Sequence, residues 1–262
     1  HTRRSHMLAH AFSSAQSHLH PWLPRRSRDA ENYGSGSEAS SGCADLSAPL
    51  AQMRAEPSIL MVGGIVSLFE GSMYIFVFNW TPALSGSTTD APPFGLIFSA
   101  FMVACMGGSS LFAILSASVP CETLLKYVFV TAAGALTMPL VAGSSTVAVL
   151  AAFLLFEACV GMYWPAIGTL KSMVVPENTR ATIYNLYRVP LNAIVLGVLL
   201  NHISTSTALS ACAVMLLVAF ALQQKLVHKI AARKGRAISE LDEDEEYGGK
   251  SDHKASLLSG SY

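Results

Sequence analysis

Charge is scarce in this sequence of 262 residues, since only 13% are Asp, Glu, Lys or Arg, whereas soluble domains carry roughly 25%. The five cysteines are scattered without any CxxC spacing, which predicts neither a disulfide framework nor a metal site. The formal net charge is zero, so no basic field attracts nucleic acid and no such partner is expected. We also expect no cofactor. Because 52% of the residues are hydrophobic, the composition argues against a water-soluble globule.

Long apolar runs fill the middle of the chain, and turn residues separate them. A membrane-spanning helix needs about 20 apolar residues, and six runs satisfy this. The sequence therefore predicts an all-α membrane protein with a six-helix bundle over residues 58–228, whose spans are 59–80, 94–117, 124–142, 146–167, 181–200 and 208–227.

Basic residues alternate between the two sides of these spans. If the chain enters from the cytoplasm, the outer loops contain no Lys or Arg, and every basic residue except Arg188 lies in or beside an inner segment. Basic residues favour the cytoplasmic side. We therefore expect a multi-pass protein of the cell (plasma) membrane with both ends cytoplasmic.

The flanking segments are polar. Residues 1–28 are unplaced and predicted to be disordered, and the five histidines within residues 1–20 are irregularly spaced. Residues 29–57 are expected to form a cytoplasmic segment. Residues 229–262 are expected to be a cytoplasmic tail whose acidic end, beginning at Glu240, is disordered.

Three charged side chains lie deep inside the predicted spans, namely Glu70, Glu157 and Arg188. Each costs roughly 2.5–3.5 kcal/mol at the centre of a spanning helix. With a rise of 1.5 Å per residue, all three lie within roughly 6 Å of the bilayer midplane. Such groups are expected to line a protein interior or a water-filled path.

Helical periodicity surrounds each charge with other polar or small residues. In the first span, Gly63, Ser67 and Gly71 form a seam of small residues for close helix contact on the face of Glu70. The opposite face, which carries Phe69 and Phe76, is expected to face lipid.

The functional interpretation is a substrate pathway. Arg188 has a planar fork of donors that suits an oxyanion, and Asn185, Asn192 and Tyr74 are the other candidate binding residues. Glu70 and Glu157 are candidates for proton coupling or gating, because a carboxylate at mid-depth can bind and release a proton. The alternative is a buried ion pair between Arg188 and one glutamate that only fixes helix register.

Several long motifs occur in order along the chain. The sequence SLFEGSMYIFVFNWTPAL from Ser67 resembles the seventh-helix signature of the molybdate-anion transporter family in the major facilitator superfamily. FEACVGMYWP from Phe156 resembles its tenth helix, PENTRATIYNLYRVPLN from Pro176 resembles its loop into the eleventh, and ENYG from Glu31 resembles its central cytoplasmic loop. The resemblance covers about residues 29–227.

The resemblance implies alternating-access transport of an oxyanion, with molybdate as the first candidate. It also implies that the chain is the C-terminal half of a twelve-helix carrier, so that the missing N-terminal six-helix half would be a partner, alongside the lipid bilayer. The competing hypothesis is a transporter-like sensor or scaffold without transport. An enzyme is not expected, because the sequence has no HExxH, GxSxG or paired-aspartate motif.

Overall fold

The computed structural model describes residues 46–85, 92–141, 145–201 and 203–259, and within these ranges it contains helices and no strand. The side chains of residues 237, 238 and 240–259 are not described. The expectations for residues 1–28 and for the ENYG motif at Glu31 fall outside the described residues.

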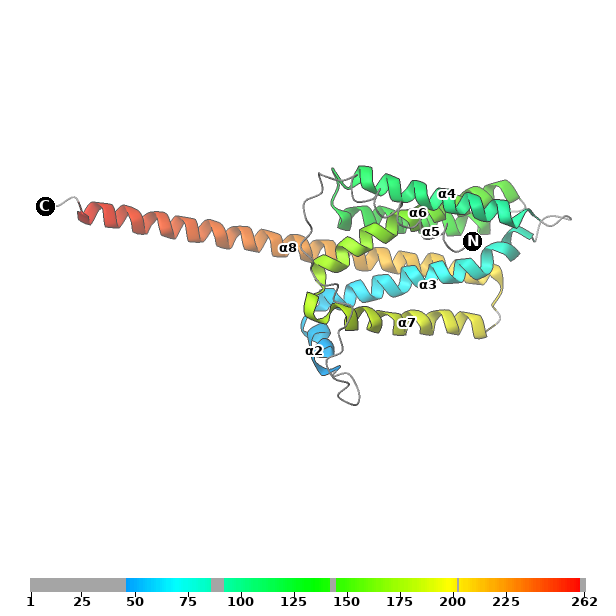
Figure 1. Ribbon diagram of the computed structural model, residues 1–262, viewed down its shortest axis with the longest axis horizontal. Helices are drawn as coiled ribbons and strands as arrows, with labels where there is room; N and C mark the ends of the chain where they lie inside the picture. Colours follow the sequence, from blue (N-terminus) through cyan, green and yellow to red (C-terminus); the bar gives the residue numbers. More distant parts are fainter. Residues whose placement is uncertain (1–45, 86–91, 142–144, 202, 260–262) are drawn as a thin grey trace, which may run out of the picture. The chain divides into compact units, whose positions relative to one another are not determined.

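In the described ranges, six long helices form the bundle, and each is long and apolar enough to cross a membrane. The predicted fold class, an all-α protein with six spanning helices, is therefore confirmed. A short helix α2 and a 3-10 turn η1 accompany the long helices. Their bounds are α2 Ser47–Ala55, α3 Pro57–Ser85, α4 Phe94–Leu115, α5 Cys121–Val141, α6 Thr146–Val174, η1 Glu177–Thr179, α7 Arg180–Leu200 and α8 Thr205–Ser259 (Figure 1).

Helix α6 is longer than the sequence predicted. It has 29 residues and continues to Val174, whereas the apolar run suggested an end near residue 167. The helix stops two residues before Pro176, which fits the bias of the residue before a proline away from helical geometry. Lys171, which the sequence placed in a loop, consequently belongs to the last turn of α6.

Helix α8 also differs from expectation. The sequence predicted a disordered acidic end, but α8 is one helix of 55 residues that continues to Ser259 and extends beyond the bundle (Figure 1). The segment after residue 228 contains no proline and is rich in Ala, Arg, Lys and Glu. These residues have high helix propensity, which accounts for the continuation.

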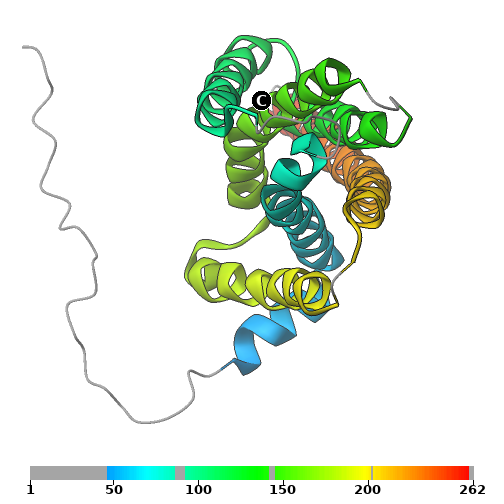
Figure 2. The ribbon, with the colours of Figure 1, turned by 90° about the vertical axis from the view of Figure 1, so that its right-hand side faces the viewer.

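Helix α3 is the central element of the bundle. It packs against α6, α7 and α8, and Figure 2 shows it between these helices in the end-on view. Phe69 and Phe76 of α3 are completely buried, and the Phe69 ring stacks on Tyr163 of α6 with ring centroids 3.9 Å apart. The expectation that this face of the helix contacts lipid is wrong, because α5 and α6 cover it.

Small residues bring α3 and α7 into close contact, as the seam in the sequence predicted. Gly63 lies directly beneath the Tyr187 ring, where a side chain larger than hydrogen would collide. The Ser67 hydroxyl donates to the carbonyl oxygen of Tyr187 at 3.0 Å, and the Tyr187 hydroxyl donates to the carbonyl oxygen of Ile59 at 2.8 Å. These contacts fix the position of α7 relative to α3.

The contact between α4 and α6 depends on a reciprocal pair of glycines. A Cβ added to Gly108 of α4 would collide with the carbonyl oxygen of Ala158, and one added to Gly161 of α6 would collide with that of Cys105. The two backbones can approach this closely only because neither glycine has a side chain.

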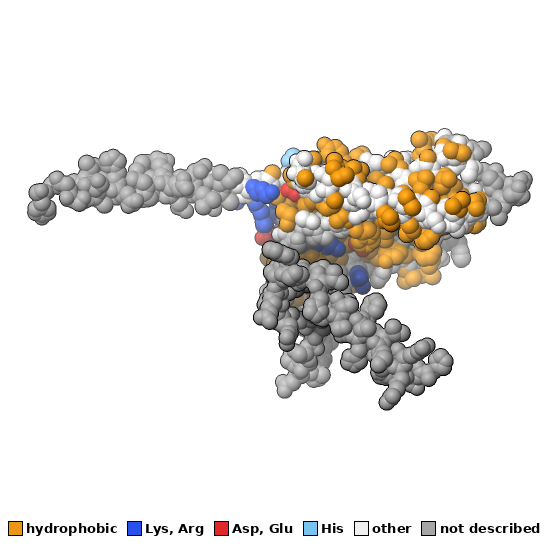
Figure 3. All heavy atoms as spheres, turned by 45° about the horizontal axis from the view of Figure 1, so that its top comes forward, with side chains coloured by type: hydrophobic (Ala, Val, Ile, Leu, Met, Phe, Trp, Pro, Cys, Tyr) orange, Lys and Arg blue, Asp and Glu red, His pale blue; other side chains and the backbone are white. Residues whose placement is uncertain are grey.

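The surface agrees with a membrane location. On the face shown in Figure 3, hydrophobic side chains are spread along the length of the bundle, and a group of basic side chains lies near the end from which α8 extends. At that end Lys234 of α8 lies 3.6 Å from the Glu122 carboxylate of α5, and Arg233 pairs with Glu56 at 2.6 Å.

Candidate functional site

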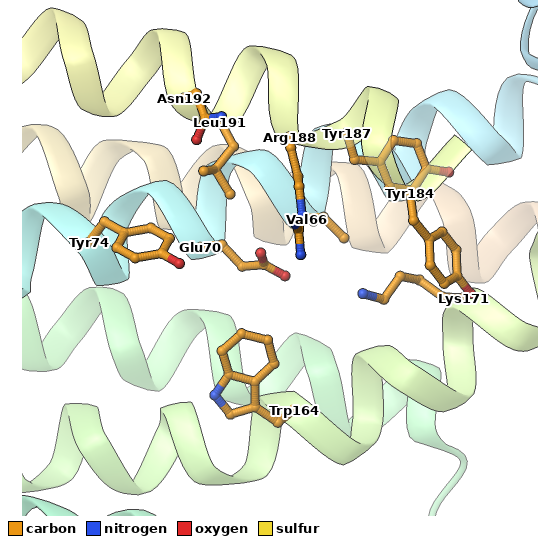
Figure 4. Close-up of a pocket in the computed structure, with 10 residues that line it drawn as sticks. All are labelled: Val66, Glu70, Tyr74, Trp164, Lys171, Tyr184, Tyr187, Arg188, Leu191 and Asn192. Carbon is orange, nitrogen blue, oxygen red and sulfur yellow. The ribbon is translucent and has the colours of Figure 1, made fainter. Parts of the chain in front are cut away.

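A cavity of about 350 Å³ lies between α3, α6 and α7. Helix α7 packs on the rest of the bundle chiefly through α3, which leaves room between α7 and α6. The cavity is lined by Val66, Glu70, Tyr74, Trp164, Lys171, Tyr184, Tyr187, Arg188, Leu191 and Asn192 (Figure 4).

Each of the three helices contributes one charged side chain to the lining. Glu70 comes from α3, Lys171 from α6 and Arg188 from α7. Figure 4 shows the three charged groups pointing toward a common space. The lining therefore carries two cations and one carboxylate.

The Glu70 carboxylate is oriented by a hydrogen bond from a buried tyrosine. The Tyr163 hydroxyl donates to Oε1 of Glu70 at 3.1 Å, and Tyr163 itself is completely buried. Its ring stacks on Phe69, one residue before Glu70 on α3. The aromatic core thus fixes the side chain that presents the carboxylate to the cavity.

The Lys171 ammonium lies over an aromatic ring. Its Nζ atom is 5.0 Å from the centroid of the Tyr184 ring, a geometry in which the negative face of the ring attracts the cation. Tyr184 is on α7, one turn before Arg188. The contact therefore joins α6 and α7 across the cavity.

Arg188 is exposed on the described bundle. Within the described ranges, ion pairs shorter than 4.0 Å join only Arg233 to Glu56 and Lys234 to Glu122. The alternative reading from the sequence, a buried pair between Arg188 and a glutamate, is therefore not what the structure contains.

The structure brings together four of the six residues that the sequence singled out. Glu70, Tyr74, Arg188 and Asn192 all line the cavity. Asn185 is exposed on α7 outside the lining.

Glu157 lies apart from this group. It is only 7% exposed and belongs to α6, one turn before Gly161, whose Cα lies against α4. Because residues four apart share a helix face, Glu157 is directed toward α4 rather than toward the cavity lining.

Sequence analysis did not select four polar or aromatic residues that line the cavity, namely Trp164, Lys171, Tyr184 and Tyr187. Lys171 lies beyond the predicted span 146–167, and Trp164 lies inside that span but has no charge that would single it out. The available signal was their spacing of seven residues, which places them on one face of a helix once α6 is known to continue to Val174. Trp164 is 44% exposed, so it contributes a ring face to the cavity rather than to the core.

The arrangement is suited to binding a small anion. The guanidinium of Arg188 offers several donors in one plane, the Lys171 ammonium adds a second positive charge, and the Asn192 amide adds a neutral hydrogen-bonding group. The Glu70 carboxylate repels a bound anion when it is ionised, and this repulsion is lost when the carboxylate is protonated.

Comparison with known proteins identifies the family. A family described as sugar transporters with twelve transmembrane helices matches residues 26–162. The chain belongs to this family of membrane transporters. Membership agrees with the prediction of a multi-pass transport protein rather than an enzyme.

Individual relatives carry a different substrate in their names. The chain is 35% identical over 204 residues to a molybdate-anion transporter of Xenopus tropicalis, which covers 72% of this chain and 43% of the relative. The corresponding protein of Xenopus laevis is 35% identical over 204 residues, covering 72% of this chain and 44% of its own length. That of Danio rerio is 38% identical over 155 residues, covering 55% and 31%. The chain thus spans less than half the length of these relatives. No solved structure matches the chain.

Proposed function

We propose that this chain is part of an alternating-access carrier that moves a tetrahedral oxyanion, with molybdate as the first candidate, across a membrane. The observation that carries the proposal is the cavity between α3, α6 and α7, whose charged lining consists of Lys171, Arg188 and Glu70. The names of the relatives supply the candidate substrate.

The charged lining favours an anion over a sugar. Burying a cation without a partner is unfavourable, and a neutral sugar cannot compensate the charges of Lys171 and Arg188. An oxyanion neutralises both and accepts hydrogen bonds from the guanidinium fork. The family description as sugar transporters therefore describes the fold of this chain better than its cargo.

The exposure of the site supports a second bundle. Arg188 and Asn192 are exposed on the described six-helix bundle, and Tyr74 and Trp164 are 43% and 44% exposed. A guanidinium in contact with lipid tails is expensive, so we infer that protein and water cover this face. We propose that a further six-helix half provides the cover, with this chain as the C-terminal half.

The residues divide into two roles in this proposal. Arg188 binds the anion, assisted by Asn192 and Tyr74 from the lining, and Asn185 joins from the exposed side of α7. Glu70 binds a proton or gates the cavity, because its charge decides whether the lining attracts a second negative charge. Glu157 has the same proposed role at the contact between α6 and α4.

The location is also part of the proposal. The distribution of basic residues supports a cytoplasmic location for both ends by the positive-inside rule, and we propose the plasma membrane as the site of action.

The test is uptake of radiolabelled molybdate by the complete gene product, in cells that lack other molybdate carriers. We expect Arg188→Ala to reduce uptake to background, because the variant loses the guanidinium that binds the anion. Lys126→Gln is the matched control, since Lys126 of α5 lies outside the cavity lining, and it is expected to keep normal uptake.

Two outcomes would contradict the proposal. If the wild-type protein accumulates no oxyanion but retains its protein partners when Arg188 is replaced, it is a sensor or scaffold. If it accumulates a neutral sugar and oxyanions do not change this uptake, the charged lining serves a purpose other than binding an oxyanion substrate.

A further inference from the structure

Lys171 is a second cation on the cavity wall, on a different helix from Arg188. It lies in the last turn of α6, is partly buried, and lines the cavity together with Arg188 of α7. In Figure 4 the ammonium and the guanidinium approach the same space from two sides. An anion held between α6 and α7 would therefore contact both.

The Lys171 ammonium is positioned by an aromatic ring and has no direct ion pair among the described side chains. The Tyr184 ring lies 5.0 Å from Nζ, and a ring face attracts an ammonium without cancelling its charge. In the part of the chain that the structure describes, no carboxylate lies within 4.0 Å of Lys171, because the ion pairs there involve Arg233 and Lys234.

The number of charges indicates the kind of anion. Two cations and one carboxylate line the cavity, so the lining has one positive charge when Glu70 is ionised and two when it is protonated. A singly charged anion leaves a positive charge uncompensated in the protonated state. In that same protonated state, a doubly charged anion compensates both cations.

We propose that Lys171 is a second anion-binding residue, which together with Arg188 makes the site select doubly charged tetrahedral oxyanions over singly charged ones. This inference rests on the proposed transport function. Coulomb energy is proportional to the product of the charges. If removal of one cation weakens binding of a monoanion by a given factor, it weakens binding of a dianion of the same shape by roughly the square of that factor.

The experiment compares tetrahedral oxyanions of similar size and different charge. The complete gene product is reconstituted in liposomes at neutral pH, and uptake of labelled molybdate is inhibited with tungstate, a dianion, or perrhenate, a monoanion. For the wild type we expect tungstate to inhibit at concentrations about tenfold lower than perrhenate. In Lys171→Gln we expect inhibition to weaken about 100-fold for tungstate and about tenfold for perrhenate, which removes the preference.

Two control variants separate charge from folding. Lys171→Arg keeps the positive charge and is expected to keep the ratio of the two inhibition constants. Lys126→Gln removes a lysine of α5 outside the cavity lining and is expected to leave both constants unchanged.

Each result decides the inference. An unchanged ratio in Lys171→Gln would overturn it, and so would a wild-type protein that does not distinguish tungstate from perrhenate, a measurement that needs no variant. Failure of the proposed function looks different, because the wild-type protein would then take up no molybdate at all.

Discussion

At the scale of single residues, the site depends on how three charged side chains are held around one cavity. Glu70 is fixed by the Tyr163 hydroxyl at 3.1 Å and Lys171 by the Tyr184 ring. Arg188 has no ion pair within 4.0 Å among the described residues. The carboxylate and the ammonium are thus oriented by buried or partly buried aromatic groups, and the guanidinium remains free to bind an anion.

The shape of the Arg188 side chain provides a residue-scale prediction. Arg188→Lys keeps the charge but replaces a planar fork by a point charge that cannot bind two oxygens in parallel. We expect molybdate uptake by the complete protein to fall about 10- to 100-fold, the effect of losing one or more charge-assisted hydrogen bonds.

The result is checked by initial uptake rates normalised to the amount of protein in the membrane. Uptake by Arg188→Lys at the wild-type rate would remove the guanidinium from the binding site and leave only its charge as a requirement.

The sequence predicted part of this site, and the reason lies in membrane energetics. Glu70 and Arg188 stood out because charged groups are rare at mid-depth, and both line the cavity. Glu157 stood out for the same reason but is buried toward α4. Depth in the membrane reveals that a charge needs compensation, whereas the direction of the side chain depends on which neighbour each helix face meets.

At the scale of helices, close contacts depend on where glycine replaces a larger residue. The seam of Gly63, Ser67 and Gly71 was predicted from sequence, and the structure places Gly63 and Gly71 against residues of α7. The opposite face of α3 was expected to contact lipid but is buried. A hydrophobic face of a spanning helix suits lipid and protein equally well, so its neighbour cannot be read from composition.

The contact between α4 and α6 allows a prediction with a neighbouring control. Gly108→Ala places a methyl group where the Ala158 carbonyl oxygen lies, while Gly107 has no atom within 4 Å of an added Cβ. We expect Gly108→Ala to lower the free energy of unfolding by about 1–3 kcal/mol, the usual cost of overpacking.

Gly107→Ala should be neutral or slightly stabilising, because alanine favours a helix over glycine by about 0.5–1 kcal/mol. The measurement is thermal or denaturant unfolding of the purified protein in detergent. Equal stability of the two variants would show that α4 and α6 can move apart without lowering the free energy of unfolding.

At the scale of the whole molecule, two outward surfaces of the bundle have different chemistry. The exposed side of α7 carries Asn185, Arg188 and Asn192, whereas the exposed side of α4 carries apolar residues such as Val103. A lipid bilayer surrounds a bundle uniformly unless another protein segment intervenes. The asymmetry therefore distinguishes a face that meets water or a second bundle from a face that meets acyl chains.

This difference leads to a prediction about access of water. A thiol must ionise to react with a methanethiosulfonate, and thiolates form only where water is present. In the complete protein within native membranes, we expect Asn192→Cys to react with a charged methanethiosulfonate about 10- to 100-fold faster than Val103→Cys. The unmodified protein, which contains the native cysteines, provides the background rate.

Added oxyanion should slow the reaction of Asn192→Cys, because the cavity that Asn192 lines would then be occupied. If Asn192→Cys is as unreactive as Val103→Cys, α7 faces acyl chains, and the guanidinium one turn away would have no aqueous path through which to receive an anion.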